Sequence, residues 1–308
     1  MTDLVVRPLV AGEEHLFTSL DADSAGALVR PDYREMVRRG EYRPESTWIA
    51  TRNDVVVARA AWWVPRGEDE PRVLDWFDFV DFADGVALLE RTPIRTEFSL
   101  TTWPNWREDP AVGVEVETRL EAARAVGMEL LVERYRYTWT SETGLPPKPG
   151  RLEFRPEPDD AKILDVFRKI HQGSLDAHAR RTTAEHGLEA AAREDLDLLL
   201  RLPSPRDWWR LAYTREGDLV GLAIPARNAT TPIVAYVGVV PEQRGHGYAY
   251  DLLVEATHEL VGYGAEKIVA ATDVTNGPMA AAFAKAGYPV KYHRIDLVWQ
   301  PIGVTLSR

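Results

Sequence analysis

The segment VGVVPEQRGHGYAYDLL, residues 237–253, decides how the second half of the chain folds. Its apolar start ends at Pro241, and a short turn that holds Arg244, Gly245 and Gly247 leads into a stretch rich in Ala, Tyr and Leu. Because proline has no N–H group to pair within a sheet, the segment predicts a strand that ends at Pro241. Apolar residues at helical spacing after the turn predict a helix that extends to about residue 263.

The turn has the features of an anion-binding site. A helix start leaves its first N–H groups unpaired, and the aligned peptide dipoles make that end positive. Gly245 and Gly247 let an anion approach the main chain closely, and Arg244 can add a charge-assisted contact. The alternative is that such a turn only connects a strand to a helix. The sequence contains no P-loop pattern and no dinucleotide-binding G-x-G-x-x-G with its acidic partner, so neither of those phosphate sites is supported.

Composition excludes several other classes of protein. The chain has 308 residues, of which 45% are hydrophobic and 28% charged, values typical of a globular protein. Its net charge of −11 disfavours binding to nucleic acid or to an anionic membrane and favours a cationic substrate. We find neither a signal-peptide pattern nor an apolar run of about 20 residues, so we expect a cytoplasmic protein. Cysteine is absent and the histidines lack metal-ligand spacing, so we expect no disulfide and no metal site.

The two halves of the chain resemble each other. Residues 141–150, SETGLPPKPG, predict an exposed linker. Each half opens with a strand-like segment followed by Arg-Pro, at 7–8 and 155–156. Each half closes with a glycine after an Ala-rich helical stretch and a tryptophan twelve residues later, at 127–139 and 287–299. Chance recurrence of short patterns is the alternative, but agreement in order and spacing favours a duplication.

The order of elements predicts an α/β fold with a mixed sheet and helices on its faces. Hairpins are expected at 46–63 and 206–225, each with a polar turn. The other elements expected in the second half are a strand at 151–155, helices at 159–171 and 184–201, a strand at 232–240, the helix to 263, a strand at 267–274 and a short helix before Gly287.

Two motifs carry a resemblance to a known family. The pattern Arg-x-x-Gly-x-Ala at Arg244, Gly247 and Ala249, after a strand that ends in Val-Val-Pro, resembles the acyl-CoA-binding motif of the GCN5-related N-acetyltransferases (GNATs). The segment 272–288 resembles the next motif of that family, in which an asparagine, here Asn276, opens a short helix that ends in Gly-aromatic. The resemblance implies two tandem GNAT-like domains.

The resemblance covers essentially all of 151–300 and, less closely, 1–140. We therefore expect a GNAT-like domain at 1–140, the linker at 141–150 and a catalytic domain at 151–308. The first half has no Arg-Gly turn where the motif should fall, and Asp81 and Asp84 there would repel a diphosphate. The first half is interpreted as a degenerate, non-catalytic copy that is retained for packing or to form one wall of the substrate site.

The resemblance also implies acetyl-CoA as the co-substrate. The main chain at Val239 and Val240 would pair with the pantetheine arm, and Asn276 would contact the cofactor from the neighbouring helix. Six consecutive main-chain amides would hold the pyrophosphate: those of Arg244, Gly245, His246, Gly247, Tyr248 and Ala249.

Direct attack of an amine on the thioester needs an oxyanion donor, a base and a departing thiolate. The resemblance places the oxyanion donor at an N–H group near Val240. Many family members place a tyrosine seven residues after the motif asparagine to protonate the thiolate, but this chain has Phe283 there. Tyr288 and Tyr250 are the substitutes, and packing is the alternative role for each. An acid is not obligatory, because a thiol with a pKa of about 8.5 already yields an adequate leaving group.

The base is predicted less directly. Asp273, at the end of a predicted strand beside the thioester slot, is the first candidate, with capping of the next helix as its alternative role. Glu242 lies beside the motif but is interpreted as a solvated turn residue. His171, Asp176 and His178 lie where family members build the acceptor wall, and helix capping is the favoured alternative for these residues.

The leading hypothesis is an N-acetyltransferase that acts on a small-molecule amine such as an aminoglycoside, a polyamine or an amino-sugar. A catalytically silent acyl-CoA-binding or structural module is the alternative. The acidic composition argues against a related enzyme class that takes aminoacyl groups from tRNA. The sequence leaves a homodimer open and does not identify the acceptor.

Overall fold

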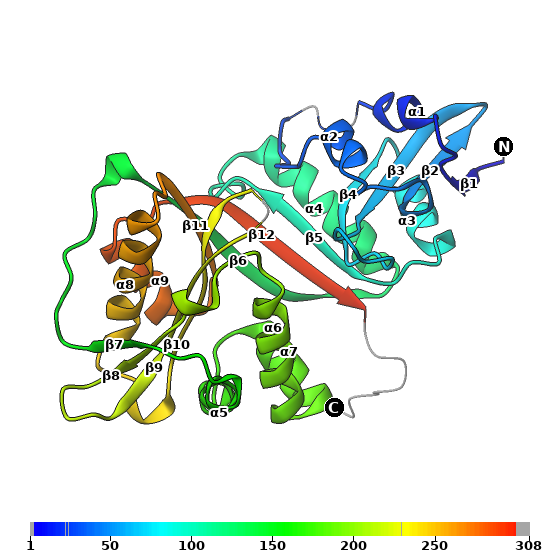
Figure 1. The fold of residues 1–308 in the computed structure, drawn as a ribbon. Coiled ribbons are helices and arrows are strands. Elements are labelled where there is room, and N and C mark those ends of the chain that lie inside the picture. Colours follow the sequence, from blue (N-terminus) through cyan, green and yellow to red (C-terminus); the bar gives the residue numbers. More distant parts are fainter. Residues whose placement is uncertain (1–2, 22, 24, 229, 300–308) are drawn as a thin grey trace, which may run out of the picture. The chain divides into compact units, whose positions relative to one another are not determined.

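The structure is a computed structural model that describes residues 3–21, 23, 25–228 and 230–299. The chain divides into two compact units (Figure 1). Unit 1 comprises the described residues up to Glu133 and from Tyr292 onward, and unit 2 comprises Arg134–Lys291. Among the helices that the structure describes, none combines the length and the apolar character needed to cross a membrane.

The strands of unit 1 follow the order β1-β2-β3-β4-β5-β12 in a mixed sheet. Strands β1 to β4 are antiparallel neighbours, β4 and β5 are parallel, and β12 is antiparallel to β5. Its elements are β1 (Val5–Pro8), α1 (Glu14–Thr18), α2 (Tyr33–Arg38), η1 (Pro44–Ser46), β2 (Thr47–Arg52), β3 (Val55–Trp63), β4 (Val73–Phe79), α3 (Phe82–Arg91), β5 (Glu97–Thr102), α4 (Pro110–Ala125), the start of β6 (Met128–Thr140) and most of β12 (Val290–Trp299).

Unit 2 repeats this plan in the order β7-β8-β9-β10-β11-β6, with β10 and β11 as its parallel pair. Its elements are the end of β6, η2 (Ser141–Thr143), β7 (Glu153–Pro156), α5 (Asp160–His171), α6 (Ala177–His186), α7 (Leu188–Leu200), η3 (Arg206–Trp208), β8 (Arg210–Tyr213), β9 (Leu219–Arg227), β10 (Pro232–Val239), η4 (Pro241–Gln243), α8 (Tyr248–Gly262), β11 (Lys267–Asp273) and α9 (Gly277–Lys285).

The shared strand order confirms the predicted fold class, a mixed α/β sheet built twice. The closing strand of each sequence half, however, completes the sheet made by the other half. Residues 134–140 of β6 pair with β11 in unit 2, and residues 293–297 of β12 pair with β5 in unit 1. The compact units therefore do not coincide with the stretches 1–140 and 151–308 that the internal resemblance delimits.

Two local features follow from backbone conformation. The turn between β2 and β3 places Asn53 and Asp54 at φ of 48° and 61°, the left-handed pair of a tight hairpin, as the sequence predicts. The single helix predicted at 184–201 is wrong in its start. Gly187, at φ 88°, separates α6 from α7, because a left-handed residue cannot continue a right-handed helix.

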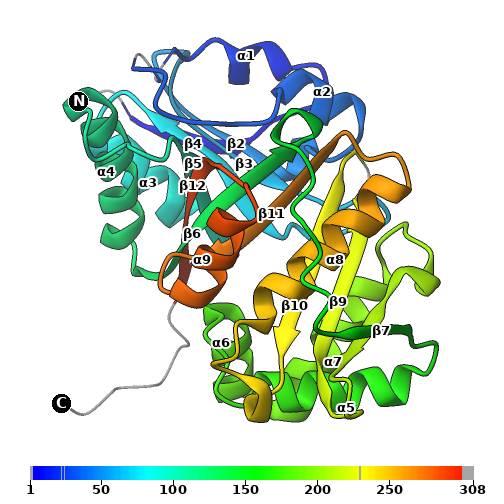
Figure 2. The same cartoon turned by 90° about the vertical axis from the view of Figure 1, so that its left-hand side faces the viewer.

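Helices cover both faces of the sheet in unit 2 (Figure 1). Helix α8 packs along β9 and β10, as Figure 2 shows, and its core residues join those of α9 in one apolar cluster with Tyr137 and Trp139 of β6. On the other face, α5 and α7 pack together in a second cluster with β9. The polar groups at the carboxyl ends of β10 and β11 therefore lie between two helical layers.

Candidate active site

The two parallel strands of unit 2 separate toward their carboxyl ends. Strands β10 and β11 are in register at a single pair, Ile233 and Val269. A β-bulge follows in β10 between Val234 and Tyr236, and such bulges increase the local twist of a strand. Beyond this point β10 has, among the residues that the structure describes, no strand neighbour other than the antiparallel β9. One edge of β10 is therefore free to hydrogen-bond to an extended ligand.

The main chain of β10 alternates between β9 and this open edge. The N–H of Val240 donates to the carbonyl of Val220 at 2.9 Å, and the Val240 carbonyl accepts from Gln243 at 3.0 Å. Because antiparallel neighbours bond at every second residue, the polar groups of Val237 and Val239 face the open edge. The oxyanion donor expected near Val240 is thus not the N–H of Val240 itself, because that group already pairs within the sheet.

The turn after β10 presents a row of main-chain N–H groups. Gly245 and Gly247 have φ of 84° and 74°, and Gly247 caps α8 without any side-chain hydrogen bond. Within the described part of the chain, five consecutive N–H groups have no hydrogen-bond partner: those of Gly245, His246, Gly247, Tyr248 and Ala249. The N–H of Arg244 differs, because it donates to the carbonyl of Pro241. A row of unpaired N–H groups at the positive end of a helix has the geometry and the polarity to bind an anion.

Arg151 supports the turn, although it lies outside both sequence motifs. Its guanidinium donates to the carbonyl of His246 at 3.0 Å and forms an ion pair with the buried carboxylate of Asp251. It also lies over the ring of Tyr248, with 4.9 Å from Cζ to the ring centroid. Because the carbonyls of His246 and Gly247 point toward Arg151, the N–H groups of the turn point away from it and can bind a ligand. Arg151 lies about a hundred residues from the turn in sequence, so no local pattern reveals the contact.

Arg244 does not point its side chain at the anion site. Its guanidinium donates to the carbonyls of Ile170 at 2.7 Å, Gln172 at 2.8 Å, Gly173 at 3.1 Å and Val239 at 3.2 Å. These four bonds use four of the five N–H donors of a guanidinium. The side chain therefore joins the end of α5 to the end of β10.

Asn276 begins α9 as the sequence predicts. Its side-chain oxygen accepts from the N–H of Met279 at 3.3 Å, which is the N-cap arrangement. The carboxylate of Asp273, in contrast, is not the cap of that helix. One of its oxygens accepts from the N–H of Ala177 at the start of α6, 2.7 Å away, and the other lies 3.1 Å from Nε of Arg134. Burial raises the pKa of Asp273, and the nearby carboxylate of Asp176 raises it further.

The tyrosine candidates are packed. The hydroxyl of Tyr288 is hydrogen-bonded to the hydroxyl of Thr257 at 2.8 Å, and burial raises its pKa. Phe283, at the usual tyrosine position, is buried and stacks on Tyr137 with 4.2 Å between ring centroids. Tyr250 is also buried, with the ammonium of Lys285 over its ring. These contacts favour the packing role for Tyr288 and Tyr250.

The hydroxyl of Tyr236 is a polar group that the sequence patterns did not predict. Tyr236 lies on the face of β10 that packs against α5 and α7, opposite the face covered by α8. Burial raises the pKa of the Tyr236 hydroxyl well above its ordinary value, and the carboxylates of Asp195 and Asp176 raise it further. A carboxylate oxygen of Asp195 is also hydrogen-bonded to Nε2 of the buried His171, at 2.8 Å. Asp176, one of the residues that the sequence offered for the acceptor wall, therefore lies near Tyr236, and it also caps α6 by accepting from the N–H of Ala179 at 2.9 Å. Strand alternation in VAYVGVV was the signal that could have identified Tyr236.

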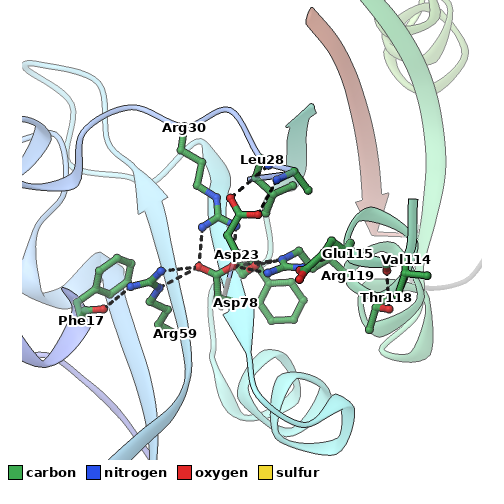
Figure 3. A network of polar contacts seen from close by, with 12 residues as sticks. Phe17, Asp23, Leu28, Arg30, Arg59, Asp78, Val114, Glu115, Thr118 and Arg119 are labelled. Carbon is green, nitrogen blue, oxygen red and sulfur yellow. Dashed lines mark hydrogen bonds and ion pairs between the residues drawn. The ribbon is translucent and has the colours of Figure 1, made fainter. Parts of the chain in front are cut away.

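The corresponding region of unit 1 is filled. Strands β4 and β5 are in register at two pairs and then separate, as β10 and β11 do. Residues 27–29 occupy the end of β5: Val29 donates to the carbonyl of Thr101 at 2.8 Å, and Leu28 forms a bridge with Thr102. The fully buried carboxylate of Asp78, on β4, binds three guanidinium groups (Figure 3), which are those of Arg30, Arg59 and Arg119.

The helix that follows β4 also lacks an anion-binding turn. Asp81 is the N-cap residue of α3, and the buried carboxylate of Asp84 in the first helical turn pairs with Arg52. Two carboxylates at a helix start already satisfy its positive end and repel a diphosphate. The expectation of one live anion site therefore rests on physical contacts as well as on the missing motif.

Two kinds of comparison, of sequence and of structure, show which known proteins this chain resembles. Residues 174–288 match the family model of the acetyltransferase (GNAT) family, and this range includes α6 to α9 and strands β8 to β11. No curated protein has a significantly similar sequence.

Several solved structures share the fold over 96% of this chain. A GCN5-related N-acetyltransferase from Sphaerobacter thermophilus is similar over 94% of its length, with 15% identity and a TM-score of 0.58. A tandem GNAT protein from the clavulanic acid biosynthesis pathway is similar over 98% of its length, with 17% identity and a TM-score of 0.52. A glucosamine N-acetyltransferase region of a fungal multi-domain β-N-acetylglucosaminidase gives a TM-score of 0.55 at 12% identity, over 38% of that chain. Residues 174–288 are therefore similar in sequence to the acetyltransferase (GNAT) family, and the chain as a whole has the fold of tandem GNAT proteins.

Proposed function

We propose that unit 2 is an acyl-CoA-dependent N-acetyltransferase that transfers the acetyl group of acetyl-CoA to the amine of a small molecule. The observation that carries the proposal is the row of five unpartnered N–H groups at 245–249, directly after a strand with one open edge. A diphosphate supplies the charge and the acceptor oxygens that such a row lacks. The pantetheine arm joined to it can then extend along the open edge of β10.

Each part of the cofactor has a partner in this proposal. The amides of 245–249 bind the diphosphate, and the N–H of Val239 pairs with the pantetheine arm, because the Val239 carbonyl already accepts from Arg244. Val240 supports the end of the strand, because both of its main-chain groups are occupied. The thioester lies at the far end of the arm from the diphosphate, so the N–H of Val237, deeper in the sheet, is the donor for the oxyanion. Asn276 lies at the start of α9 and keeps its side-chain NH₂ group for the cofactor.

The reaction itself needs little from protein side chains. The neutral amine attacks the thioester carbonyl, the C–N bond forms, the C–S bond breaks, and the thiolate leaves with the electron pair. The thiolate is stable enough to leave without a dedicated acid, which fits the buried Phe283 and the occupied hydroxyl of Tyr288. The nitrogen of the tetrahedral intermediate loses its extra proton to solvent or to a nearby carboxylate, and the amide remains as the product.

The acceptor is inferred to be cationic before it reacts. The carboxylates of Asp176 and Asp195 lie close enough to Tyr236 to raise its pKa, so acidic groups are present on that side of the strand. An ammonium group is attracted to such groups, and the net charge of −11 acts in the same direction over longer distances. Polyamines, amino-sugars and aminoglycosides are the corresponding substrates, and the glucosamine N-acetyltransferase region with the same fold supports the amino-sugars.

A second candidate function keeps the cofactor and lacks the chemistry. The buried Phe283 at the usual tyrosine position favours a silent acyl-CoA-binding module. Titration calorimetry with acetyl-CoA, followed by a thiol-release assay with glucosamine, spermidine and kanamycin, separates the two. We expect micromolar binding and thiol release that depends on an amine. Binding without release over a broad amine panel would support the silent module, and absence of binding would contradict both.

A further inference from the structure

We propose that Arg244 is a positioning residue that fixes the acceptor-side segment 172–176 across the open end of β10 and β11, and not a ligand of the cofactor phosphates. The segment, called the strap below, connects the end of α5 to the start of α6. This inference rests on the proposed function, because it assigns the strap to the acceptor side of the same site.

The first end of the strap is held by Arg244. Three of the four carbonyls that its guanidinium binds belong to Ile170, Gln172 and Gly173, at the junction of α5 and the strap. The fourth belongs to Val239, the last residue of β10. A side-chain carbon at Gly173 would lie 3.2 Å from Nη1 of Arg244, and Gly173 has φ of 67°. Glycine at this position therefore permits both the turn and the close approach of the guanidinium.

The second end of the strap is held from the neighbouring strand. Asp273, the last residue of β11, accepts the hydrogen bond from the N–H of Ala177 that follows the strap. Arg134 lies between the two carboxylates, 3.1 Å from Asp273 and 3.3 Å from Asp176. The strap is thus attached to the end of β10 on one side and to the end of β11 on the other, so it spans the opening between them.

The packing of α5 keeps the strap close to the site. A side-chain carbon at Gly238 would lie 2.7 Å from Cδ1 of Ile170, so only glycine lets the last turn of α5 approach β10 this closely. The strap itself carries the partly exposed side chains of Leu175 and Asp176, an apolar and an acidic group. A cationic acceptor with an apolar portion matches this pair.

Arg244 is also the residue directly before the anion-binding row at 245–249. A conformational change of the turn when the cofactor binds is therefore transmitted to the strap through the side chain of Arg244. If the guanidinium turned to a phosphate instead, four carbonyls would lose their donor, and unpaired main-chain groups are costly wherever water cannot replace the bond. The contacts thus indicate that Arg244 connects the anion-binding turn to the strap.

The test compares Arg244→Ala and Arg244→Lys in the full chain, with Arg193→Ala on the surface of α7 as the matched control. Coenzyme A affinity is measured by calorimetry, and exchange of the amides at 172–176 by hydrogen–deuterium exchange with and without coenzyme A. We expect both Arg244 variants to keep coenzyme A affinity within about three-fold and to exchange the strap about ten-fold faster, because lysine keeps the charge but cannot span four carbonyls. The control should change neither quantity.

A loss of coenzyme A affinity of ten-fold or more in Arg244→Ala, restored by lysine while strap exchange stays as in the unmodified protein, would overturn the proposal. Gly173→Ala approaches the same contact from the other partner, and we expect it to accelerate strap exchange as well. If the unmodified protein binds no coenzyme A, the proposed function fails, whereas strap exchange in the Arg244 variants still decides this inference. Unchanged strap exchange in all three variants would refute it.

Discussion

A carboxylate oxygen of Asp273 accepts a hydrogen bond from the main-chain N–H of Ala177 at 2.7 Å, which joins the end of β11 to the start of α6. The same carboxylate is the base that the sequence favours, so the two roles need to be separated. Asp273→Asn keeps an oxygen for the Ala177 N–H and removes the charge.

For a positioning role we expect Asp273→Asn to lower turnover by less than about ten-fold, with an unchanged pH profile of kcat/KM. Loss of a general base costs roughly a hundred-fold or more, and high pH restores the rate because the amine then deprotonates in solution. Steady-state thiol release between pH 6 and 10 distinguishes the two. Asp273→Ala, which removes the acceptor oxygen, serves as the structural comparison and should destabilise α6 as well.

Gly245→Ala tests the anion-binding row against a matched glycine. Gly245 and Gly264 flank α8 at its two ends, both have φ of 84°, and neither would place a side-chain carbon within 4 Å of another atom. The strain of a left-handed alanine, about 1–2 kcal/mol, is therefore the same at both positions. We expect Gly245→Ala to weaken coenzyme A binding at least ten-fold and Gly264→Ala to leave it unchanged, as measured by calorimetry. Equal losses in the two variants would indicate a general effect on α8.

Removal of β6 tests which residues complete unit 2. A fragment 151–308 lacks Tyr137 and Trp139, which are buried in the core beside α8 and α9. Truncation of one buried large aromatic residue costs about 3–5 kcal/mol, a large share of the stability of a domain. We expect fragment 151–308 to show no cooperative thermal unfolding, whereas fragment 134–291 unfolds cooperatively. The opposite result would show that the sequence halves fold as predicted from their internal resemblance.

Asp75, in unit 1, gives a prediction on pH. Burial raises its pKa to about 7, against the lowering effects of a hydrogen bond from Tyr42 and of the charge on Arg30. The folded protein therefore binds more protons than the unfolded chain between about pH 4 and pH 7, so stability falls as the pH rises through this range. Asp75→Asn stays neutral and keeps an oxygen for Tyr42. We expect its melting temperature to rise relative to the unmodified protein from pH 5 to pH 8. Asp197→Asn, at an exposed carboxylate of α7, should show no such pH-dependent gain.

Local patterns in the sequence predicted much of the fold. The strand that ends before Pro241, the glycine turn, α8 and α9 were all expected close to their observed positions, because each depends on residues adjacent in sequence. The exchange of β6 and β12 was not predicted. An alternating pattern identifies a strand and its buried face, but it does not identify the strand that becomes its neighbour.

The site shows the same limit. The unpartnered amides follow from glycine and helix geometry, which the sequence displays. The contacts of Arg151 with Asp251 and of Arg244 with Ile170 join residues far apart along the chain, so only the folded structure reveals them. The role of Arg244 illustrates this most clearly, because the motif predicts a charge for the phosphate and the contacts place that charge on carbonyl groups.

The most direct test is a crystal structure of the full chain with coenzyme A. We predict that the diphosphate lies within hydrogen-bond distance of the amides at 245–249, that the pantetheine arm follows the open edge of β10, and that Arg244 keeps its four carbonyl partners. Cofactor density in unit 1, or at any place other than the start of α8, would contradict the account.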